Sequence, residues 1–262
     1  MTRMRSRASA SLNGQIAKTV EFFNVRYPGA RAEQLSPIQR LVFERFTALI
    51  PIGRSDQVAV DLGCHWGRYT RFLARSFGEV WGIDAAAEAV ASAPEVQNLR
   101  FRVMDLEDPT QEFPFQRGVD CFLATGLFEL LRDPQRLCAR LGKAANPGCR
   151  ALVIIPNRRS IHYRVFRLTL WAARRLLARR SLYIYNNGAR LEDVVRWMRA
   201  GGFRVAGRGA VVGLPPSVLD RLPHVVQTRL LVLDSAAVTL CGGSYHWVLM
   251  EKETGVAGAT DR

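Results

Sequence analysis

The chain has few cysteines and no long apolar run. These two features argue against a disulfide-rich protein, a cysteine-ligated metal site and a membrane-spanning protein. The five cysteines, at positions 64, 121, 138, 149 and 241, form neither a disulfide framework nor the paired spacing of a metal site. We therefore expect no metal, and a reducing cytoplasm in which cysteines pack as small apolar side chains. No apolar stretch reaches the length of a membrane span, and the basic residues 1–10 lack the apolar core of a secretory signal.

Acidic residues are missing between Pro134 and Leu191, where thirteen Lys and Arg side chains occur. The rest of the chain then holds 37 − 13 = 24 basic and 23 acidic residues, so nearly all of the formal net charge of +14 comes from this stretch. Lysine is scarce as well, because 34 of the 37 basic residues are arginine. This ratio suggests a compositional bias towards arginine and weakens any argument for an anionic partner that rests on arginine alone.

The most informative segment joins an apolar strand to a helix through a glycine turn. Val58–Val60 reads as a buried strand, Gly63 and Gly67 let the backbone approach a ligand closely, and Tyr69–Ser76 has helical spacing. The free N–H groups at the start of that helix would face the ligand. Asp61 ends the strand, and its carboxylate would repel a dinucleotide pyrophosphate but attract a cationic ligand.

Two further apolar strands also end in aspartate. Val80–Asp84 places the Asp84 carboxylate 23 residues after Asp61, the spacing at which an acidic side chain can bind both ribose hydroxyls. Leu99–Asp105 alternates like a third strand and ends in Asp105. Each aspartate alone could be a helix cap or a loop acid, but three at successive strand ends indicate one nucleoside site.

With these three carboxylates in order, residues 55–205 resemble the class I S-adenosylmethionine-dependent methyltransferases of the small-molecule and lipid-acceptor type, with further similar elements up to about residue 251. The resemblance implies an α/β fold, a Rossmann-like doubly wound seven-stranded sheet whose last strand, Tyr245–Lys252, is antiparallel. It also implies N-terminal helices, a basic helical insertion after the fifth strand, and S-adenosylmethionine as the cofactor.

The resemblance also assigns roles at the cofactor site. Asp84 would bind the ribose and Asp105 the adenine amino group, with Met104 and Leu106 on either side of the ring. The full set of expected cofactor-binding residues is Asp61, Gly63, Cys64, Trp66, Gly67, Asp84, Ala85, Met104, Asp105, Leu106 and Thr125.

His65 and Trp66 depart from the resembled family, which commonly has glycine at the first position and often a small residue at the second. Histidine is among the non-glycine residues that adopt positive φ more readily, so the turn can still form. Trp66 would either offer its π face to the sulfonium or pack the helix against the sheet. His65 would either face the acceptor or stay solvated.

The remaining pattern alternates strands and helices. Expected strands are Gly118–Ala124, Ala151–Ile155 and Phe203–Val212, and expected helices are Ser36–Ile50, Gln135–Lys143 and Arg190–Ala200, with a turn at Asn146–Gly148. Ser36 and Pro37 are typical of a helix start. The expected organisation is a helical cap over residues 1–50, a methyltransferase domain over 51–252 with an insertion at 158–189, and a tail over 253–262.

No residue is an unambiguous general base. His65, Glu129, His162 and Tyr185 are the options by position, and we select His65 and Glu129 as catalytic candidates. Leu130 stands where the family often has a histidine after the glutamate. Residues Asn186–Gly188 read as a turn that leads into a helix. The candidate substrate-binding residues are Tyr27, Asn157, Tyr163 and Tyr185.

The basic segment 158–180 is amphipathic when drawn as a helix. It would pack on the domain, lie on an anionic membrane surface, or touch RNA, and we regard nucleic acid as the least favoured partner. We expect an enzyme that methylates a small-molecule or lipid-like acceptor at oxygen, in the cytoplasm or at the inner membrane surface. The alternatives are an RNA or protein methyltransferase, or a catalytically silent protein that keeps the cofactor fold. An Asn/Asp-Pro-Pro-aromatic motif of amino methylation is absent after the fourth strand, where Thr125–Phe128 stands instead.

Overall fold

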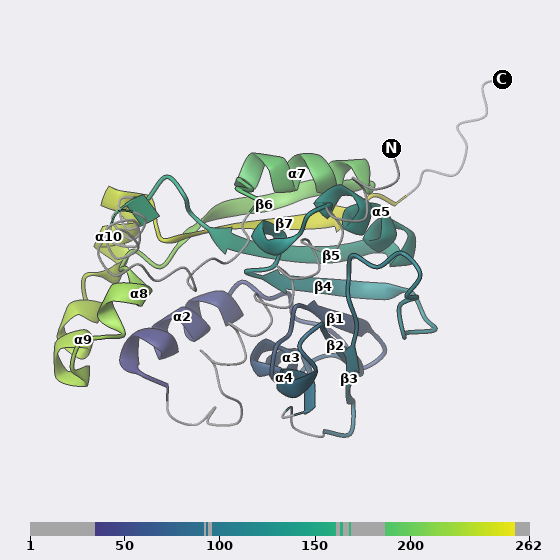
Figure 1. Cartoon of the computed structure of the whole chain (residues 1–262), viewed down its shortest axis with the longest axis horizontal. Helices are drawn as coiled ribbons and strands as arrows, with labels where there is room; N and C mark the ends of the chain where they lie inside the picture. Colours follow the sequence, from purple (N-terminus) through teal and green to yellow (C-terminus); the bar gives the residue numbers. More distant parts are fainter. Residues whose placement is uncertain are drawn as a thin grey trace, which may run out of the picture.

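The computed structural model describes residues 35–91, 93, 96–160, 163–164, 168 and 187–254. Their strands form one seven-stranded sheet in the order β3-β2-β1-β4-β5-β7-β6 (Figure 1). The strands are β1 (Val58–Leu62), β2 (Glu79–Asp84), β3 (Leu99–Val103), β4 (Val119–Thr125), β5 (Ala145–Pro156), β6 (Phe203–Val211) and β7 (Tyr245–Lys252). Strand β7 runs antiparallel to both β5 and β6, whereas β1 to β5 pair in parallel. The expected fold class is confirmed.

Helices cover both faces of this sheet. They are α2 (Pro37–Thr47), α3 (Arg68–Leu73), α4 (Ala87–Ala91), the 3₁₀ helix η1 (Phe128–Leu130), α5 (Pro134–Ala144), α7 (Leu191–Ala200), α8 (Pro216–Leu219), α9 (His224–Leu231) and α10 (Asp234–Cys241). Figure 1 shows α5 and α7 on one face and α2 and α3 on the other. Among the described residues, no helix is both long and apolar enough to cross a membrane.

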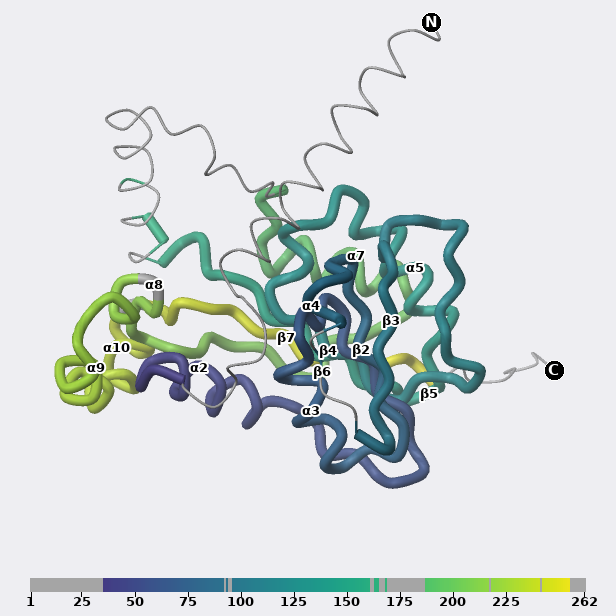
Figure 2. Tube along the Cα trace, turned by 60° about the horizontal axis from the view of Figure 1, so that its bottom comes forward, coloured from purple at the N-terminus to yellow at the C-terminus, as the bar shows by residue number. Residues whose placement is uncertain are grey.

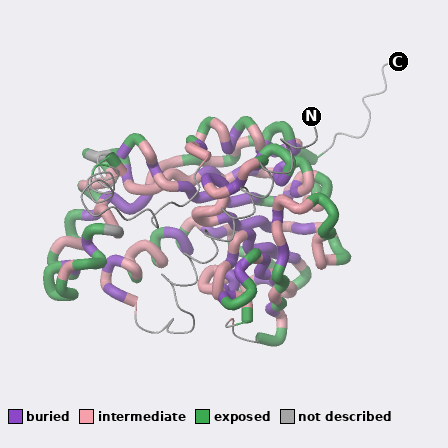
Figure 3. The backbone as a smooth tube through the Cα atoms, in the orientation of Figure 1, coloured by how far each residue is buried: buried purple, intermediate pink, exposed green. Residues whose placement is uncertain are grey.

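The core consists of two apolar layers, one on each face of the sheet. Val58, Val60 and Leu62 pack towards α5 and α7, while Ala59 packs with Phe46 and Leu73 on the α2 and α3 side. All five residues of β1 are buried, which explains why this strand reads as a continuous apolar run rather than an alternating one. Figure 3 shows the buried residues concentrated along the strands.

Helix α2 is joined to the helices between β6 and β7. Ser36 caps α2, and Gln39 completes the capping box, so the expected helix start is confirmed. Gln227 of α9 accepts a hydrogen bond from the backbone N–H of Ile38 at 3.1 Å. Arg45 of α2 lies 3.3 Å from the buried Asp234 carboxylate of α10. Figure 2 shows α2 beside α8, α9 and α10, at one end of the sheet.

Most expected elements form within two residues of their predicted bounds, but one predicted turn was wrong and three helices were not predicted. The predicted turn at Asn146–Gly148 belongs to β5, which begins at Ala145, although Gly148 does have a positive φ of 77° and the β4–β5 register shifts nearby. Helices α8, α9 and α10 were not predicted at all. Most of the insertion 158–189, residues 1–34 of the expected cap and residues 255–262 of the expected tail lie outside the described residues.

Candidate cofactor and acceptor site

A cavity of about 590 Å³ lies at the carboxyl ends of the parallel strands. Its lining comes from the segments that follow β1, β2, β3 and β4, from the end of β5, from the start of β7, and from α2 and α8. Ligands of open α/β sheets bind in this crevice, where the strand order reverses. The cavity is within the usual size range of small-molecule sites.

The turn after β1 has the tight backbone that the glycines predicted. Gly63, His65 and Gly67 all have positive φ angles, of 71°, 51° and 81°. The backbone N–H groups of Gly63 and Cys64 both donate to the carbonyl oxygen of Ile83, at 2.8 and 3.1 Å. His65 therefore takes the conformation that glycine would supply, and the turn is retained despite the substitution. Gly63, Cys64, His65 and Trp66 line the cavity, whereas Gly67 caps α3 and does not.

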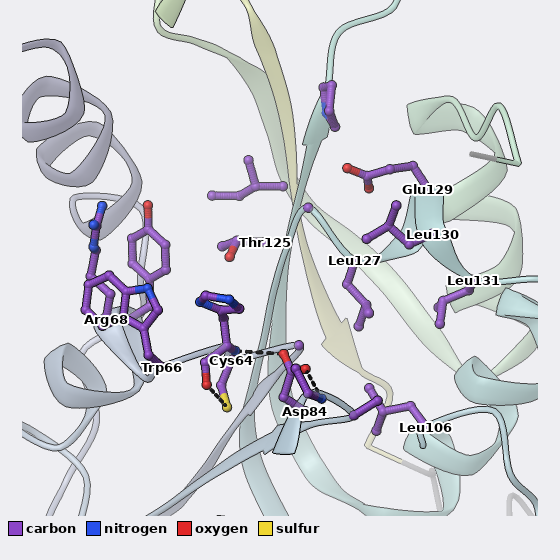
Figure 4. A pocket seen from close by; sticks show the side chains of 18 of the residues that line it. Cys64, Trp66, Arg68, Asp84, Leu106, Thr125, Leu127, Glu129, Leu130 and Leu131 are labelled. Carbon is purple, nitrogen blue, oxygen red and sulfur yellow. Dashed lines mark hydrogen bonds between the residues drawn. The ribbon is translucent and has the colours of Figure 1, made fainter. Parts of the chain in front are cut away.

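Asp84 connects this turn to the end of β2. Its Oδ2 atom accepts a hydrogen bond from the backbone N–H of His65 at 2.7 Å, and its Oδ1 atom accepts one from Ala86 at 2.8 Å (Figure 4). Each carboxylate oxygen has more than one acceptor site, so the group can still bind two hydroxyls. Asp84 and Ala85 both line the cavity, at the position expected for a ribose.

The segment after β3 forms the adjoining part of the wall. Met104, Asp105 and Leu106 all line the cavity, although β3 itself ends earlier, at Val103. Asp105 accepts a hydrogen bond from the Glu107 backbone N–H at 2.9 Å through Oδ1. Met104 and Leu106 are buried. The three residues therefore share one part of the cavity wall, and their contact with an adenine ring stays a prediction.

Asp61 is not among the residues that line the cavity. Its side chain is buried beneath the turn, where Oδ2 accepts a hydrogen bond from the Thr70 hydroxyl at 2.7 Å. Burial, offset in part by this hydrogen bond, raises the pKa of Asp61 to about 7. The structure thus places this carboxylate, which we expected to bind the cofactor, below the turn and in contact with Thr70 of α3.

Trp66 lines the cavity, but its ring is already in contact with a protein cation. The guanidinium carbon of Arg68 lies 4.6 Å from the centre of the indole ring, a cation–π distance. Figure 4 shows Trp66 and Arg68 together on one wall. The observed π contact of Trp66 is therefore with Arg68, and a contact with a sulfonium stays a prediction.

Glu129 lies on the opposite wall, with Leu127, Leu130 and Leu131 (Figure 4). It belongs to η1, immediately after β4, and Thr125 at the end of β4 also lines the cavity. The Glu129 side chain is buried, and among the described residues its Oε2 atom has no hydrogen-bond partner. Burial raises the pKa of Glu129 to about 7, opposed by a hydrogen bond to the residue's own backbone N–H and, more weakly, by the charge of Arg158.

The rest of the lining was missed by sequence reasoning. It comes mainly from apolar and aromatic side chains of α2, α3, β5 and β7, together with polar groups at the rim. In addition to Leu127, Leu130 and Leu131, these residues are Gln39, Val42, Phe46, Arg68, Tyr69, Ala86, Glu107, Gly126, Arg132, Ile154, Pro156, Pro216, Asp220 and Tyr245. Helical spacing identified α2 and α3 in the sequence, but nothing local shows which helix face meets a cavity that is completed by β7 and α8.

The two candidate substrate residues that the structure describes, Asn157 and Tyr163, lie away from this cavity. Asn157 donates through Nδ2 to the carbonyl oxygens of Gly242 and Gly243, at 2.8 and 2.9 Å, and so holds the chain before β7. Tyr163 lies near Arg158, 5.5 Å from guanidinium carbon to ring centre. Neither residue lines the cavity. Tyr27, His162 and Tyr185, and most of the basic segment 158–180, lie outside the described residues.

Comparisons with known proteins agree with this geometry. Residues 60–151 match the family model described as "Methyltransferase domain", which covers the turn, Asp84, Asp105 and Glu129. No curated protein sequence matches the chain.

Solved structures of methyltransferases share the fold at low identity. One is an S-adenosylmethionine-dependent methyltransferase from Mesorhizobium loti, with 16% identity, TM-score 0.55, and coverage of 82% of this chain and 98% of that one. Another is geranyl diphosphate C-methyltransferase from Streptomyces coelicolor A3(2), in complex with Mg²⁺, geranyl diphosphate and S-adenosyl-L-homocysteine, with 17% identity, TM-score 0.53, and coverage of 82% and 76%.

A third similar chain comes from a complex between the Haloferax volcanii Trm112 methyltransferase activator and a methyltransferase. It has 17% identity and a TM-score of 0.58, and the match covers 89% of this chain and 93% of that one. These structural similarities establish the fold, and the match to the methyltransferase-domain model is limited to residues 60–151.

Proposed function

We propose that this chain, which carries a class I S-adenosylmethionine-dependent methyltransferase domain, moves the methyl group to an oxygen of a small, largely apolar acceptor. S-adenosylmethionine is its cofactor. The cavity residues fit that cofactor. The positive φ angles of the turn after β1 let its backbone approach a ligand closely, and Asp84 offers acceptors for two hydroxyls. Met104 and Leu106 offer apolar faces beside Asp105.

The observation that carries this proposal is the Glu129 carboxyl on the cavity wall. A base near pKa 7 is suited to proton removal at neutral pH, and burial brings the pKa of Glu129 to about 7. Because Glu129 lines the cavity and its Oε2 atom has no hydrogen-bond partner among the described residues, the carboxyl is the group that we propose takes a proton from a bound acceptor. An acceptor O–H is such a proton source, and its oxygen becomes the nucleophile.

The walls beside Glu129 indicate what kind of acceptor fits. Leu127, Leu130 and Leu131 flank the carboxyl, and Phe46 and Ile154 contribute further apolar surface. Such walls favour an acceptor that is apolar around its reacting hydroxyl. The similar Streptomyces coelicolor enzyme binds geranyl diphosphate, and the geranyl chain of that ligand illustrates the apolar character that we propose for the acceptor here.

The charge of the lining argues against RNA as the acceptor. Although the chain as a whole has a formal net charge of +14, the described lining includes more acids than arginines. The acids are Asp84, Asp105, Glu107, Glu129 and Asp220, and the arginines are Arg68 and Arg132. A phosphate-rich ligand would meet repulsion inside the cavity, whereas the cationic sulfonium of the cofactor would be attracted.

The reaction needs little from the protein besides alignment and proton removal. S-adenosylmethionine supplies an electrophilic methyl carbon when it is bound. Glu129 takes the proton from the acceptor hydroxyl, while the apolar walls orient the acceptor and exclude water. The deprotonated acceptor oxygen would then be placed to receive that methyl group, with the cofactor's thioether as the leaving group.

The test is a transfer assay with S-adenosylmethionine that carries a labelled methyl group. The full chain is incubated separately with apolar phenols, apolar hydroxy acids, protein extract and total RNA. We expect label in the organic phase with an apolar hydroxylated acceptor and none in the RNA or protein fractions. Label in RNA or protein alone, or calorimetric binding of S-adenosylhomocysteine without any transfer, would overturn the proposal in favour of the macromolecular or the silent alternative.

A further inference from the structure

We infer that Asn187 is a positioning residue that holds Glu129 in its buried, proton-accepting place on the cavity wall. The inference rests on the proposed function of Glu129, and it assigns a role to a residue outside the lining of the cavity. In the sequence, Asn187 reads only as part of a turn that leads into α7.

Asn187 binds three backbone carbonyls in and just after η1. Its Nδ2 group donates to the carbonyl oxygens of Phe128 and Leu131, at 2.8 and 2.7 Å. Its backbone N–H donates to the carbonyl oxygen of Glu129 at 2.9 Å. One asparagine therefore satisfies the carbonyls of three of the four residues from Phe128 to Leu131.

These bonds matter because η1 has little stability of its own. A 3₁₀ helix of three residues cannot satisfy its own terminal carbonyls. The Glu129 carboxyl adds no anchor at Oε2, which has no partner among the described residues. The place of this side chain is consequently set by its backbone, and Asn187 holds that backbone.

Asn187 is itself fixed in one orientation. Its Oδ1 atom accepts a hydrogen bond from the backbone N–H of Ala189 at 2.7 Å, and Gly188 between them has a positive φ of 83°. With Oδ1 and Nδ2 both engaged, the amide cannot rotate without losing bonds. The turn before α7 thus connects that helix to the glutamate.

Loss of these bonds should therefore change the ionisation of Glu129. Burial keeps the pKa of Glu129 at about 7, so a looser η1 that admits water lowers this pKa towards the ordinary value of a glutamate. A purely structural role for Asn187 would instead lower the stability of the protein and leave the Glu129 titration unchanged.

The experiment is a ¹³C NMR titration of the full chain labelled at glutamate carboxyl carbons. Glu129 is assigned by the signal that disappears in Glu129→Gln. In Asn187→Ala we expect the Glu129 midpoint to fall by roughly one pH unit or more. The serine of Asn187→Ser can donate to one carbonyl only, so the Glu129 midpoint of this variant should lie between those of the wild type and Asn187→Ala. Asn187→Ser replaces the alanine variant in the test if the alanine variant does not fold.

Asn98 offers a matched control. Its Nδ2 group also donates to two carbonyl oxygens, those of Ala74 and Phe77, at 2.9 and 2.7 Å, away from η1. Asn98→Ala should lose stability but keep the Glu129 midpoint. An unchanged midpoint in Asn187→Ala, or an equal shift in Asn98→Ala, would overturn the inference. If Glu129→Gln keeps full methyl transfer, the proposed role of Glu129 as the base is wrong. The positioning role of Asn187 can still be tested, because the titration of Glu129 does not depend on activity.

Discussion

Asp61 and Glu129 are two buried carboxyl groups with the same pKa of about 7 and different surroundings. Burial is the largest cause of the raised pKa in both. Asp61 is bonded to the Thr70 hydroxyl and does not reach the cavity, whereas Glu129 lines it. The comparison teaches that a raised pKa does not by itself identify a catalytic base. The carboxyl group must also be in contact with the ligand cavity to act as the base.

Substitution of Glu129 gives the largest expected effect. Glu129→Gln keeps the shape of the side chain but removes the proton acceptor, so the rate of methyl transfer should fall by roughly 10²–10⁴-fold. In the wild type the carboxylate form is active, and the rate should rise as pH increases through about 7. The measurement is a single-turnover pH profile with the acceptor that the transfer assay identifies.

Asp61→Asn is the matched control for this profile, since it alters the other carboxyl with a pKa near 7. In Asp61→Asn, the rise of the methyl-transfer rate through about pH 7, which is the limb of the pH profile, should coincide with that of the wild type. S-adenosylhomocysteine should bind equally well to Glu129→Gln and to the wild type. If instead Asp61→Asn removes the limb and Glu129→Gln retains it, the assignment of the base is reversed.

The next largest effect is expected at Asp84, which serves the cofactor rather than the proton. Asp84→Ala removes the acceptor for the ribose and the bond to the His65 backbone N–H. Hydrogen bonds to a charged group contribute roughly 1.5–3 kcal/mol each, so affinity for S-adenosylhomocysteine should fall by roughly 10²-fold or more. Calorimetry measures this loss.

Asp84→Asn separates the two causes of that loss. The asparagine keeps an acceptor for the His65 N–H and loses the charge, so its affinity should lie between those of the wild type and Asp84→Ala. Binding to Asp84→Ala that equals the wild type would remove the ribose assignment altogether.

The cofactor side of the site was largely predictable because its signals are local in the sequence. The glycine turn, Asp84, and Asp105 with its neighbours lie at or just after strand ends, and parallel strands end at the same edge of a sheet. Nine of the eleven expected cofactor residues therefore line the cavity, and Asp61 and Gly67 are the exceptions. Asp61 differs because Thr70, in the first turn of α3, captures its carboxylate.

The acceptor side could not be read in the same way. Tyr245 begins a strand that runs antiparallel between β5 and β6, and Asp220 follows a short helix that no strong pattern announces. Their place depends on α2 docking against α8 and α9, through contacts that join residues more than 180 positions apart. A single sequence contains no local signal for such pairings.

Asp61 also allows a test of the cost of burying a carboxyl. Its pKa is raised to about 7 when folded and is close to 3.8 when unfolded, so the folded state holds the proton between these values. The stability that this group contributes is therefore complete below about pH 3.8, is lost as pH rises, and is gone above about pH 7.

Asp61→Asn should remove the part of the pH dependence that Asp61 carries, whereas the part due to the raised pKa of Glu129 remains. We expect the substitution to raise the free energy of unfolding at pH 8 by roughly 1–2 kcal/mol, a gain that the burial of the new amide limits. Chemical denaturation at pH 5 and pH 8 measures the difference. An Asp61→Asn variant whose stability falls with pH as steeply as the wild type would show that another group carries the dependence.

The smallest expected effect concerns Asp105, whose carboxylate would accept one hydrogen bond from the adenine amino group. Asp105→Ala should weaken S-adenosylhomocysteine binding by about tenfold, the contribution of a single such bond. S-inosylhomocysteine lacks the amino group, so the wild type should prefer the adenosyl form and Asp105→Ala should bind both forms alike. An adenosyl preference that survives the substitution would place the adenine elsewhere, because the discrimination depends on this one contact. Since Asp105 also accepts the Glu107 backbone N–H, the ratio of the two affinities is the decisive quantity, for it cancels any change in the shape of the loop.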